Sequence, residues 1–168
     1  EQLVFLENNF KGKKILVEKP LFEFLENFQI KNNQVFVGYN LRFHPIMKKI
    51  KEKIAGKNLW NIQVFCGSYL PHWRPKRDYR ESSSAMKKKG GGVVLDLSHE
   101  LDYIQWLTGP ISLKYVVNEK VSDLEIDTDD LLLFSGLTGD GAYLQVCLNY
   151  FTRPPVRQIL MDGESISI

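Results

Sequence analysis

Four strand-like segments follow one another in the second half of this chain, and they constrain its fold more than any other feature. They span residues 111–117, 131–137, 143–149 and 156–161. The run Thr138-Gly139-Asp140-Gly141 between the second and third is typical of a hairpin turn. Strands in direct succession, joined by turn signals, predict a largely antiparallel sheet with helices on one face.

The first forty residues follow a different pattern, in which helices and strands alternate. A helix to about Phe10 precedes the apolar run at 15–17, and a second strand is expected at 35–39. Pro20 opens a helix between these strands. The apolar stripe of that helix comprises Leu21, Phe24, Leu25 and Phe28. This order is typical of a doubly wound parallel sheet. The fold class is therefore α/β, with residues 1–40 ending a Rossmann-like domain and 41–168 forming an α+β domain with a mostly antiparallel open sheet.

Two helices and a strand are expected between these regions. A helix closes at Gly56, and its apolar stripe comprises Ile46, Met47, Ile50 and Ile54. A strand follows at 60–66, and after a long loop a helix runs from near Asp96 to Gly109-Pro110. At about 100° per residue, one face of this last helix is predicted to carry Asp96, His99, Tyr103 and Trp106.

Composition excludes several classes of protein. The 168 residues carry a net charge of only +2, which argues against nucleic acid as a partner. No apolar run approaches the ~20 residues that a membrane span needs, and the first residues lack the features of a signal peptide, so a cytoplasmic location is expected. Cys66 and Cys147 lack metal-ligand spacing and are expected to be reduced core thiols, with no metal site.

Both ends of the chain have an unusual character. It opens with Glu1-Gln2-Leu3 in what reads as the middle of a helix, and 161–168 reads as a strand, an Asp-Gly turn and an incomplete strand. The phosphate-binding pattern Gly-x-Gly-x-x-Gly does not occur in the 168 residues. We therefore expect a fragment that lacks most of its nucleotide-binding domain, is truncated at its carboxyl end and is itself inactive.

Two motifs place ionisable groups at structural transitions. Glu18-Lys19-Pro20 ends the first apolar run, where a buried strand meets a loop. The segment Gly90-Gly91-Gly92 leads into the helix that carries Asp96, His99 and Asp102. Glycines at this point are interpreted as permissive backbone close to a ligand.

Together with Gly38-Tyr39-Asn40-Leu41-Arg42-Phe43-His44-Pro45, these motifs resemble the Gfo/Idh/MocA family of glucose-fructose oxidoreductases and inositol dehydrogenases. The resemblance covers essentially the whole chain. It implies hydride transfer between NAD or NADP, bound by the full-length parent, and a carbon of a sugar or nucleotide sugar. It also implies a homo-oligomer formed through the open sheet.

The resemblance also implies roles for individual residues. His99 is the acid-base group, Lys19 touches both cofactor and substrate, and Glu18 and Pro20 complete the cofactor motif. The commoner family pattern has an aspartate four residues before the histidine, where this chain has Leu95. Asp96, three residues before, is then the candidate partner of His99, and Asp102, one turn later, is the alternative.

The loop of residues 69–80 is both basic and aromatic, and in this family it would border the substrate pocket. Its candidate substrate-binding residues are Trp73, Arg74, Tyr79 and Arg80. Arg74, Arg77 and Arg80 suit a carboxylated sugar or a sugar diphosphate, because both need bidentate donors. A solvated or oligomer-contacting loop is the alternative. Arg42 and His44 resemble positions in family members that act on nucleotide-linked amino sugars.

Two other functions stay open at this point. Some members of the family use the cofactor as a tightly held redox catalyst for glycoside cleavage, and these motifs would serve an NAD-dependent glycoside hydrolase as well. Because the phosphate-binding turn is missing, a non-catalytic dimerisation or binding fragment is the other possibility.

Overall fold

The computed structural model describes residues 2–22 and 27–168. These form two compact units, Glu1–Asn40 and Leu41–Ile168. Each unit is described by itself.

The first unit contains one helix and two parallel strands. Helix α1 (Gln2–Asn9) is followed by β1 (Lys14–Val17) and β2 (Gln34–Val37), which pair in parallel from Lys14↔Gln34 to Val17↔Val37. The parallel pairing confirms the expected sheet type. The predicted helix after Pro20 is wrong in its described part, because residues 21–22 and 27–32 are not helical. Phe24 and Leu25, on its predicted stripe, lie outside the described residues.

A single carboxylate organises the connections of the first unit. Glu7 is buried, and its Oε1 accepts hydrogen bonds from the backbone amides of Lys31 at 2.6 Å and Asn32 at 2.5 Å. Its Oε2 accepts one from the side-chain amide of Asn33 at 2.7 Å. The segment that enters β2 is therefore held to α1 by polar contacts.

The second unit is a six-stranded sheet with the order β4-β5-β6-β3-β7-β8. The strands are β3 (Leu59–Gly67), β4 (Ile111–Glu119), β5 (Leu131–Thr138), β6 (Tyr143–Asn149), β7 (Val156–Gly163) and β8 (Ile166–Ser167). All neighbouring pairs are antiparallel except β3 and β6, which run parallel. The mostly antiparallel sheet is as predicted, and the parallel pair brings the ends of β3 and β6 to the same edge.

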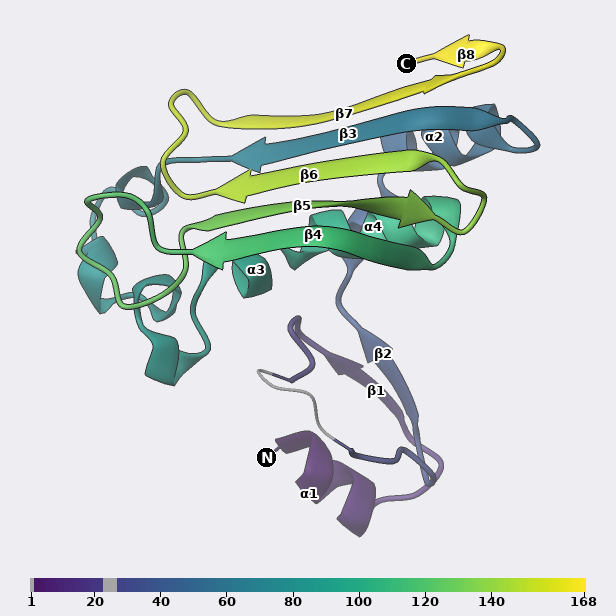
Figure 1. The fold of residues 1–168 in the computed structure, drawn as a ribbon. Coiled ribbons are helices and arrows are strands. Elements are labelled where there is room, and N and C mark those ends of the chain that lie inside the picture. Colours follow the sequence, from purple (N-terminus) through teal and green to yellow (C-terminus); the bar gives the residue numbers. More distant parts are fainter. Residues whose placement is uncertain (1, 23–26) are drawn as a thin grey trace. The chain divides into compact units, whose positions relative to one another are not determined.

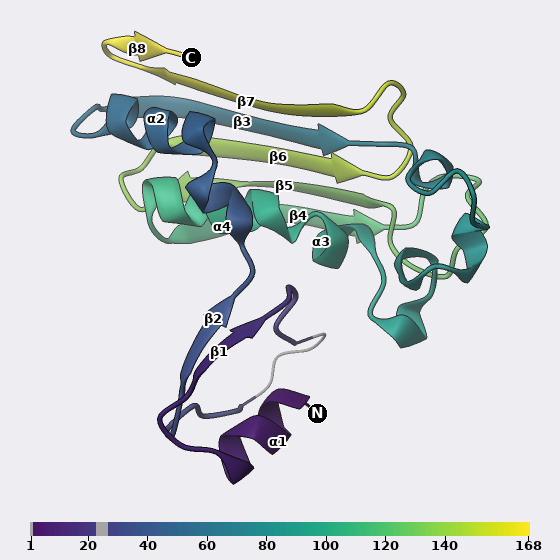
Figure 2. The same ribbon diagram turned by 180° about the vertical axis from the view of Figure 1, so that it is seen from behind.

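Three helices cover one face of this sheet, and Figures 1 and 2 show that the other face carries no helix. They are α2 (Pro45–Ile54), α3 (Val93–Asp96) and α4 (Ser98–Thr108). Short 3-10 turns connect them to the sheet: η1 (Asn40–Phe43), η2 (Leu70–His72), η3 (Tyr79–Glu81), η4 (Ser83–Ala85) and η5 (Lys87–Lys89). The helix expected after the glycines is therefore two helices.

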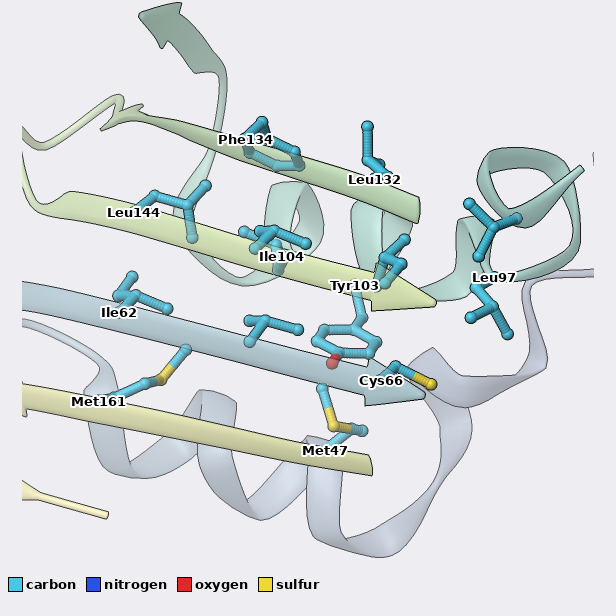
Figure 3. Close-up of a cluster of buried hydrophobic side chains, with 14 of the residues drawn as sticks. Met47, Ile62, Cys66, Leu97, Tyr103, Ile104, Leu132, Phe134, Leu144 and Met161 are labelled. Carbon is cyan, nitrogen blue, oxygen red and sulfur yellow. The ribbon is translucent and has the colours of Figure 1, made fainter. Parts of the chain in front are cut away.

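The core of the second unit lies between the helices and the sheet. Strand residues alternate between buried and more exposed positions, so that Ile62, Leu144 and Met161 face the helices. Figure 3 shows Tyr103 and Ile104 of α4 packed against them, with Tyr103 near Cys66 and Met47. Tyr103 is only 2% exposed, so its predicted place on a site-facing stripe with His99 is wrong. Tyr103 belongs to the core cluster instead, and the helix break at Leu97 separates only Asp96 from His99 and Tyr103, which are both on α4.

Candidate functional site

The glycine-rich turn is shaped by close contacts within the protein. A Cβ on Gly91 would lie 2.1 Å from the carbonyl oxygen of Ser83, and Gly92 has a φ of +123°. A Cβ on Gly92 would also lie 2.3 Å from Oδ1 of Asp129. Both positions thus require glycine, as the sequence indicates. The close approach that the sequence analysis assigned to a ligand is made in this structure by Ser83, Ser84 and Asp129.

An acidic segment, which the sequence analysis did not single out, holds this turn in place. Oδ1 of Asp127 accepts a hydrogen bond from the amide of Lys87 at 2.6 Å. The backbone carbonyl of Asp129 accepts one from Val93 at 3.1 Å, and its Oδ2 accepts one from Val94 at 3.1 Å. Asp129 therefore satisfies two amides at the start of α3, where helices leave amide groups without intrahelical partners. The signal in the sequence was Asp127-Thr128-Asp129-Asp130, three carboxylates in four residues.

Asp96 and His99 lie on opposite sides of the junction between two helices. Asp96 is the last residue of α3 and His99 the second residue of α4, with Leu97 between them at φ −98° and ψ 22°. Leu97 is buried and anchors the junction in the core. Asp96 and His99 therefore do not share one continuous helix, and the junction at Leu97 sets their relative orientation.

The carboxylate of Asp96 accepts a hydrogen bond from the hydroxyl of Tyr150 at 2.6 Å. Tyr150 is completely buried, and this burial, together with the charges of Asp96 and Asp129, raises the pKa of its phenol far above the ordinary range. The phenol stays protonated and remains a donor. The indole of Trp73 packs edge-on against the Tyr150 ring at 5.3 Å and donates to Oγ of Ser68 at 2.6 Å. Tyr150 therefore links Asp96 to the basic loop.

The structure joins two other predicted site residues in an ion pair. Nε of Arg42 donates to Oδ2 of Asp102 at 2.7 Å, and a second hydrogen bond joins Nη2 and Oδ1. The Asp102 side chain is only 8% exposed, so the pair ties η1 to α4 in a largely buried position. Asp102, the alternative partner for His99, thus has Arg42 as its ionic partner. His44 is the N-cap of α2, where its Nδ1 accepts from the amide of Ile46 at 3.2 Å.

Glu100, next to His99 in the chain, is a buried carboxylate that pairs with a half-exposed arginine. Nε of Arg157 on β7 donates to its Oε1 at 2.6 Å, and Glu100 is completely buried. The neighbouring Cys66 thiol has a pKa raised to about 11, first by burial and then by the charge of Glu100. The pair fixes the first turn of α4 against β7, and with it the backbone that carries His99.

The basic loop encloses a hollow of about 420 Å³, whose lining includes Trp73, Arg74, Arg77 and Tyr79. Arg80 points its guanidinium at two carboxylates instead, Asp78 at 2.6 Å and Glu125 at 3.2 Å. Hydrogen bonds from Arg80 hold the pKa of Asp78 below its usual range. The hydroxyl of Tyr79 accepts from the amide of Glu125 at 3.1 Å. Of the predicted substrate-binding residues, Trp73, Arg74 and Tyr79 therefore share one hollow.

The cofactor motif of the first unit lies at the carboxyl end of β1. Glu18, Lys19 and Pro20 follow Val17 directly, and the bond between Lys19 and Pro20 is cis. The amide of Gly38 donates to the carbonyl of Val17 at 2.8 Å, and a Cβ there would lie 3.4 Å from Oε2 of Glu18. Gly38 thus leaves space beside the motif at the edge where parallel sheets bind ligands. The cofactor-binding roles that the resemblance implies for Glu18, Lys19 and Pro20 stay predictions.

Two further observations concern metals and membranes. Among residues 2–22 and 27–168, no group of three or more His, Cys, Asp or Glu side chains is arranged to hold a metal ion. No helix in this part of the chain is long and apolar enough to cross a membrane. Cys66 and Cys147 are both free thiols.

The second unit thus has an α+β architecture, with ionisable side chains at the junction between α3 and α4. Residues 47–168 match the family model of the GFO/IDH/MocA C-terminal domain. Because this match covers well over half of the chain, the chain belongs to the Gfo/Idh/MocA family.

Individual relatives agree with this assignment. The uncharacterized oxidoreductase sll0816 of Synechocystis sp. is 29% identical over 107 residues, which is 59% of this chain and 29% of that protein. The WlbA dehydrogenase of Bordetella pertussis, solved with NADH and UDP-GlcNAcA, is 20% identical with a TM-score of 0.66, covering 79% of this chain and 41% of its own.

Two solved structures extend the likeness in fold. A D-galactose-1-dehydrogenase from Rhizobium etli has a TM-score of 0.73 at 15% identity and covers 99% of this chain and 61% of its own. A myo-inositol dehydrogenase from Corynebacterium glutamicum has a TM-score of 0.63 at 17% identity, over 80% of this chain and 40% of its own. The chain spans less than two thirds of each of these proteins.

Proposed function

We propose that this chain is the substrate-handling part of an NAD(P)-dependent oxidoreductase that transfers hydride between the cofactor and a hydroxyl-bearing carbon of a sugar or nucleotide sugar. The observation that carries the proposal is the 2.6 Å hydrogen bond from Tyr150 to Asp96, which fixes a carboxylate three residues before His99. Family membership supports it, as does the WlbA structure that contains NADH and a nucleotide sugar.

In this proposal His99 takes the proton from the substrate hydroxyl and returns it in the reverse direction. Histidine exchanges protons near neutral pH, which suits this task. Asp96 is the positioning residue. Tyr150 holds its carboxylate, and Asp129 holds the backbone at the start of α3. The family resemblance implies contact of Lys19 with both cofactor and substrate, and a positive charge beside a substrate hydroxyl favours its alkoxide form.

The nicotinamide, when bound, supplies the hydride acceptor or donor. Glu18, Lys19 and Pro20 are the residues of this chain that would hold its reactive end. The pattern Gly-x-Gly-x-x-Gly, which binds the cofactor's phosphates in such domains, does not occur in the 168 residues. We therefore propose that the activity belongs to a longer protein in which this chain is one part.

Replacement of His99 in that longer protein tests the proposal. His99→Ala should lower kcat by on the order of 10² to 10⁴, the usual contribution of a positioned acid-base group. Tyr150→Phe should cost less and shift the acidic limb of the pH-rate profile, because it removes only the donor to Asp96. Lys53→Gln on the exposed side of α2 is the control. An unchanged kcat for His99→Ala with a true substrate would overturn the proposed role.

We further propose that the uncovered face of the second unit's sheet binds a second copy of this chain. This face carries a shallow hollow of about 390 Å³, and none of its lining residues is charged. The most exposed large apolar residues beside or within it are Tyr115 at 64% and Tyr143 at 70%. Uncharged, apolar surface with scattered glutamines is typical of a homodimer interface rather than of a solvated sheet.

A charge placed in the centre of this face tests whether the face binds a second copy of the chain. Leu133→Glu should convert a dimer into a monomer in size-exclusion chromatography with light scattering, because a carboxylate would face its own symmetry mate. Lys114→Glu, on an edge strand, is the matched control. A monomeric parent chain at micromolar concentration would contradict the proposed interface.

A further inference from the structure

One arginine outside the predicted motifs is held on an aromatic ring. The guanidinium carbon of Arg153, in the connection between β6 and β7, lies 3.5 Å from the centroid of the Tyr69 ring. That ring and the ring of His72 form a T-shaped pair, with centroids 4.8 Å apart. Stacking leaves the in-plane N–H groups of a guanidinium available, and these match the two oxygens of a carboxylate or phosphate.

The connection that carries Arg153 is rigidly built. Asn149 is only 2% exposed, and its Oδ1 accepts three hydrogen bonds, from the amides of Phe151 at 3.1 Å and Thr152 at 2.9 Å and from the Thr152 hydroxyl at 2.8 Å. A Cβ on Gly67 would lie 2.4 Å from Oγ1 of Thr152. The absence of a side chain at Gly67 therefore lets this connection lie against the end of β3, and Arg153 starts from a fixed backbone.

The other arginines differ in what they contact. Arg42, Arg80 and Arg157 each form an ion pair with a carboxylate of the protein, whereas Arg74 and Arg77 line the hollow of the basic loop. Arg153 forms none of the ion pairs found among residues 2–22 and 27–168. Within the described part of the chain its guanidinium therefore has no carboxylate in an ion pair, and the exposed side chain is supported by an aromatic ring.

Arg153 lies at the same end of the sheet as the candidate site. β3 and β6 are parallel and end together at Gly67 and Asn149, and the amide of Leu70 donates to the carbonyl of Tyr150 at 2.9 Å. Tyr150 in turn bonds Asp96 and packs on Trp73. One short stretch of chain, residues 149–153, therefore carries both the donor to Asp96 and the stacked arginine.

We infer that Arg153, supported by Tyr69, binds an oxyanion of the substrate, either a sugar carboxylate or a phosphate of a nucleotide sugar. The inference rests on the proposed function in taking this ligand to be the substrate. Arg153, in the connection after β6, would then select an anionic sugar together with the arginines of the basic loop. Neutral sugars, which offer only hydroxyl groups, make weaker hydrogen bonds to the same guanidinium.

NMR titration of the chain tests this, with the Nε–Hε signals of its six arginines observed directly. The probes are glucuronate, UDP-N-acetylglucosamine, inorganic pyrophosphate and neutral N-acetylglucosamine. We expect the Arg153 signal to shift in a saturable manner with at least one anionic probe and not with the neutral sugar. Glucuronate alone would identify a carboxylate site, whereas UDP-N-acetylglucosamine and pyrophosphate together would identify a phosphate site.

Variants separate a specific site from general attraction of anions. Arg153→Gln should weaken binding of the effective probe roughly tenfold to hundredfold, as expected for charged hydrogen bonds. Tyr69→Leu should weaken it less, and Tyr69→Phe, which keeps the ring, should retain it. Lys53→Gln, with the same change in charge, should have no effect.

Two results would overturn the inference: an Arg153→Gln chain that binds the anions as tightly as the parent, or shifts confined to Arg74 and Arg77. These results would leave the proposed hydride transfer untouched. Conversely, a longer protein that transfers no hydride to any sugar would defeat the proposed function while a binding result at Arg153 remained valid.

Discussion

The two units of this chain are stabilised in different ways. In the described part of residues 1–40, Leu3 is the only hydrophobic side chain that is buried, while Leu16 is 74% and Phe36 is 52% exposed on paired positions of the two strands. The second unit buries a continuous cluster between its helices and six strands. A two-stranded sheet with open apolar positions is marginal by itself, whereas the second unit has the core of an independent domain. The second unit therefore contains most of the stabilising core and most of the candidate site residues.

Separating the units tests this comparison most directly. Residues 41–168 expressed alone should unfold cooperatively at nearly the midpoint of the whole chain, because the core lies entirely within them. A peptide of residues 1–40 should show no cooperative transition by circular dichroism. If residues 41–168 failed to fold, the second unit would depend on the first and the comparison would fail.

The buried ion pair of the second unit should give the next largest effect. Arg157→Met leaves the fully buried Glu100 without its cation. It should lower the free energy of unfolding by about 2–3 kcal/mol. The usual loss of ~3–5 kcal/mol is reduced here because the Arg157 side chain is 49% exposed. The double variant Glu100→Leu with Arg157→Met should recover much of that loss. Urea denaturation measures both, with Lys53→Gln as control. Equal losses in the single and double variants would contradict the argument.

The polar contacts of the first unit should give the smallest effect, and one that depends on pH. Hydrogen bonds from the amide of Asn32 and then the side chain of Asn33 lower the pKa of Glu7 below its ordinary value of 4.5. A lowered folded-state pKa contributes stability that is present above the ordinary value and lost as the pH falls through the folded-state value.

Glu7→Gln should therefore reduce hydrogen-exchange protection of the amides of Asn32 and its neighbours at pH 7. It should also remove the loss of protection that the parent chain shows as the pH falls below about 4.5. The second unit should be unaffected, and Glu52→Gln on the exposed side of α2 serves as control. A parent chain whose protection at 31–33 did not change with acid would contradict this role of Glu7.

Much of the fold was predictable because its signals are local. Alternation of apolar residues located β3 to β7 to within about two residues at most ends, and the turn at residues 138–141 was recognised from its glycines. The helix expected after Pro20 failed in its described part, where apolar spacing favoured a helix but the chain is instead held by Glu7. Apolar periodicity in a short segment is thus a weak signal when no core is available to receive it.

The candidate site was only partly predictable for a different reason. Gly90-Gly91-Gly92, Asp96 and His99 were found because they are contiguous in sequence. Tyr150 and Asp129, which contact them, are 54 and 37 residues away from Asp96 and Gly92, respectively. Tyr150 carries no motif of its own, and the acidic run that contains Asp129 does not indicate which groups it contacts. The functional roles of these residues stay predictions.

By itself, the sequence determined the succession of strands, the glycines that the turn at 90–92 requires and the family to which the chain belongs, because each depends on neighbouring residues or on a contiguous motif. The tertiary structure alone decided which charges meet: Arg42 with Asp102, Arg157 with Glu100, and Tyr150 with Asp96. These pairs join residues 54 to 60 positions apart. Only the packing of the helices on the sheet brings such groups within hydrogen-bonding distance, and burial then determines how strongly they interact.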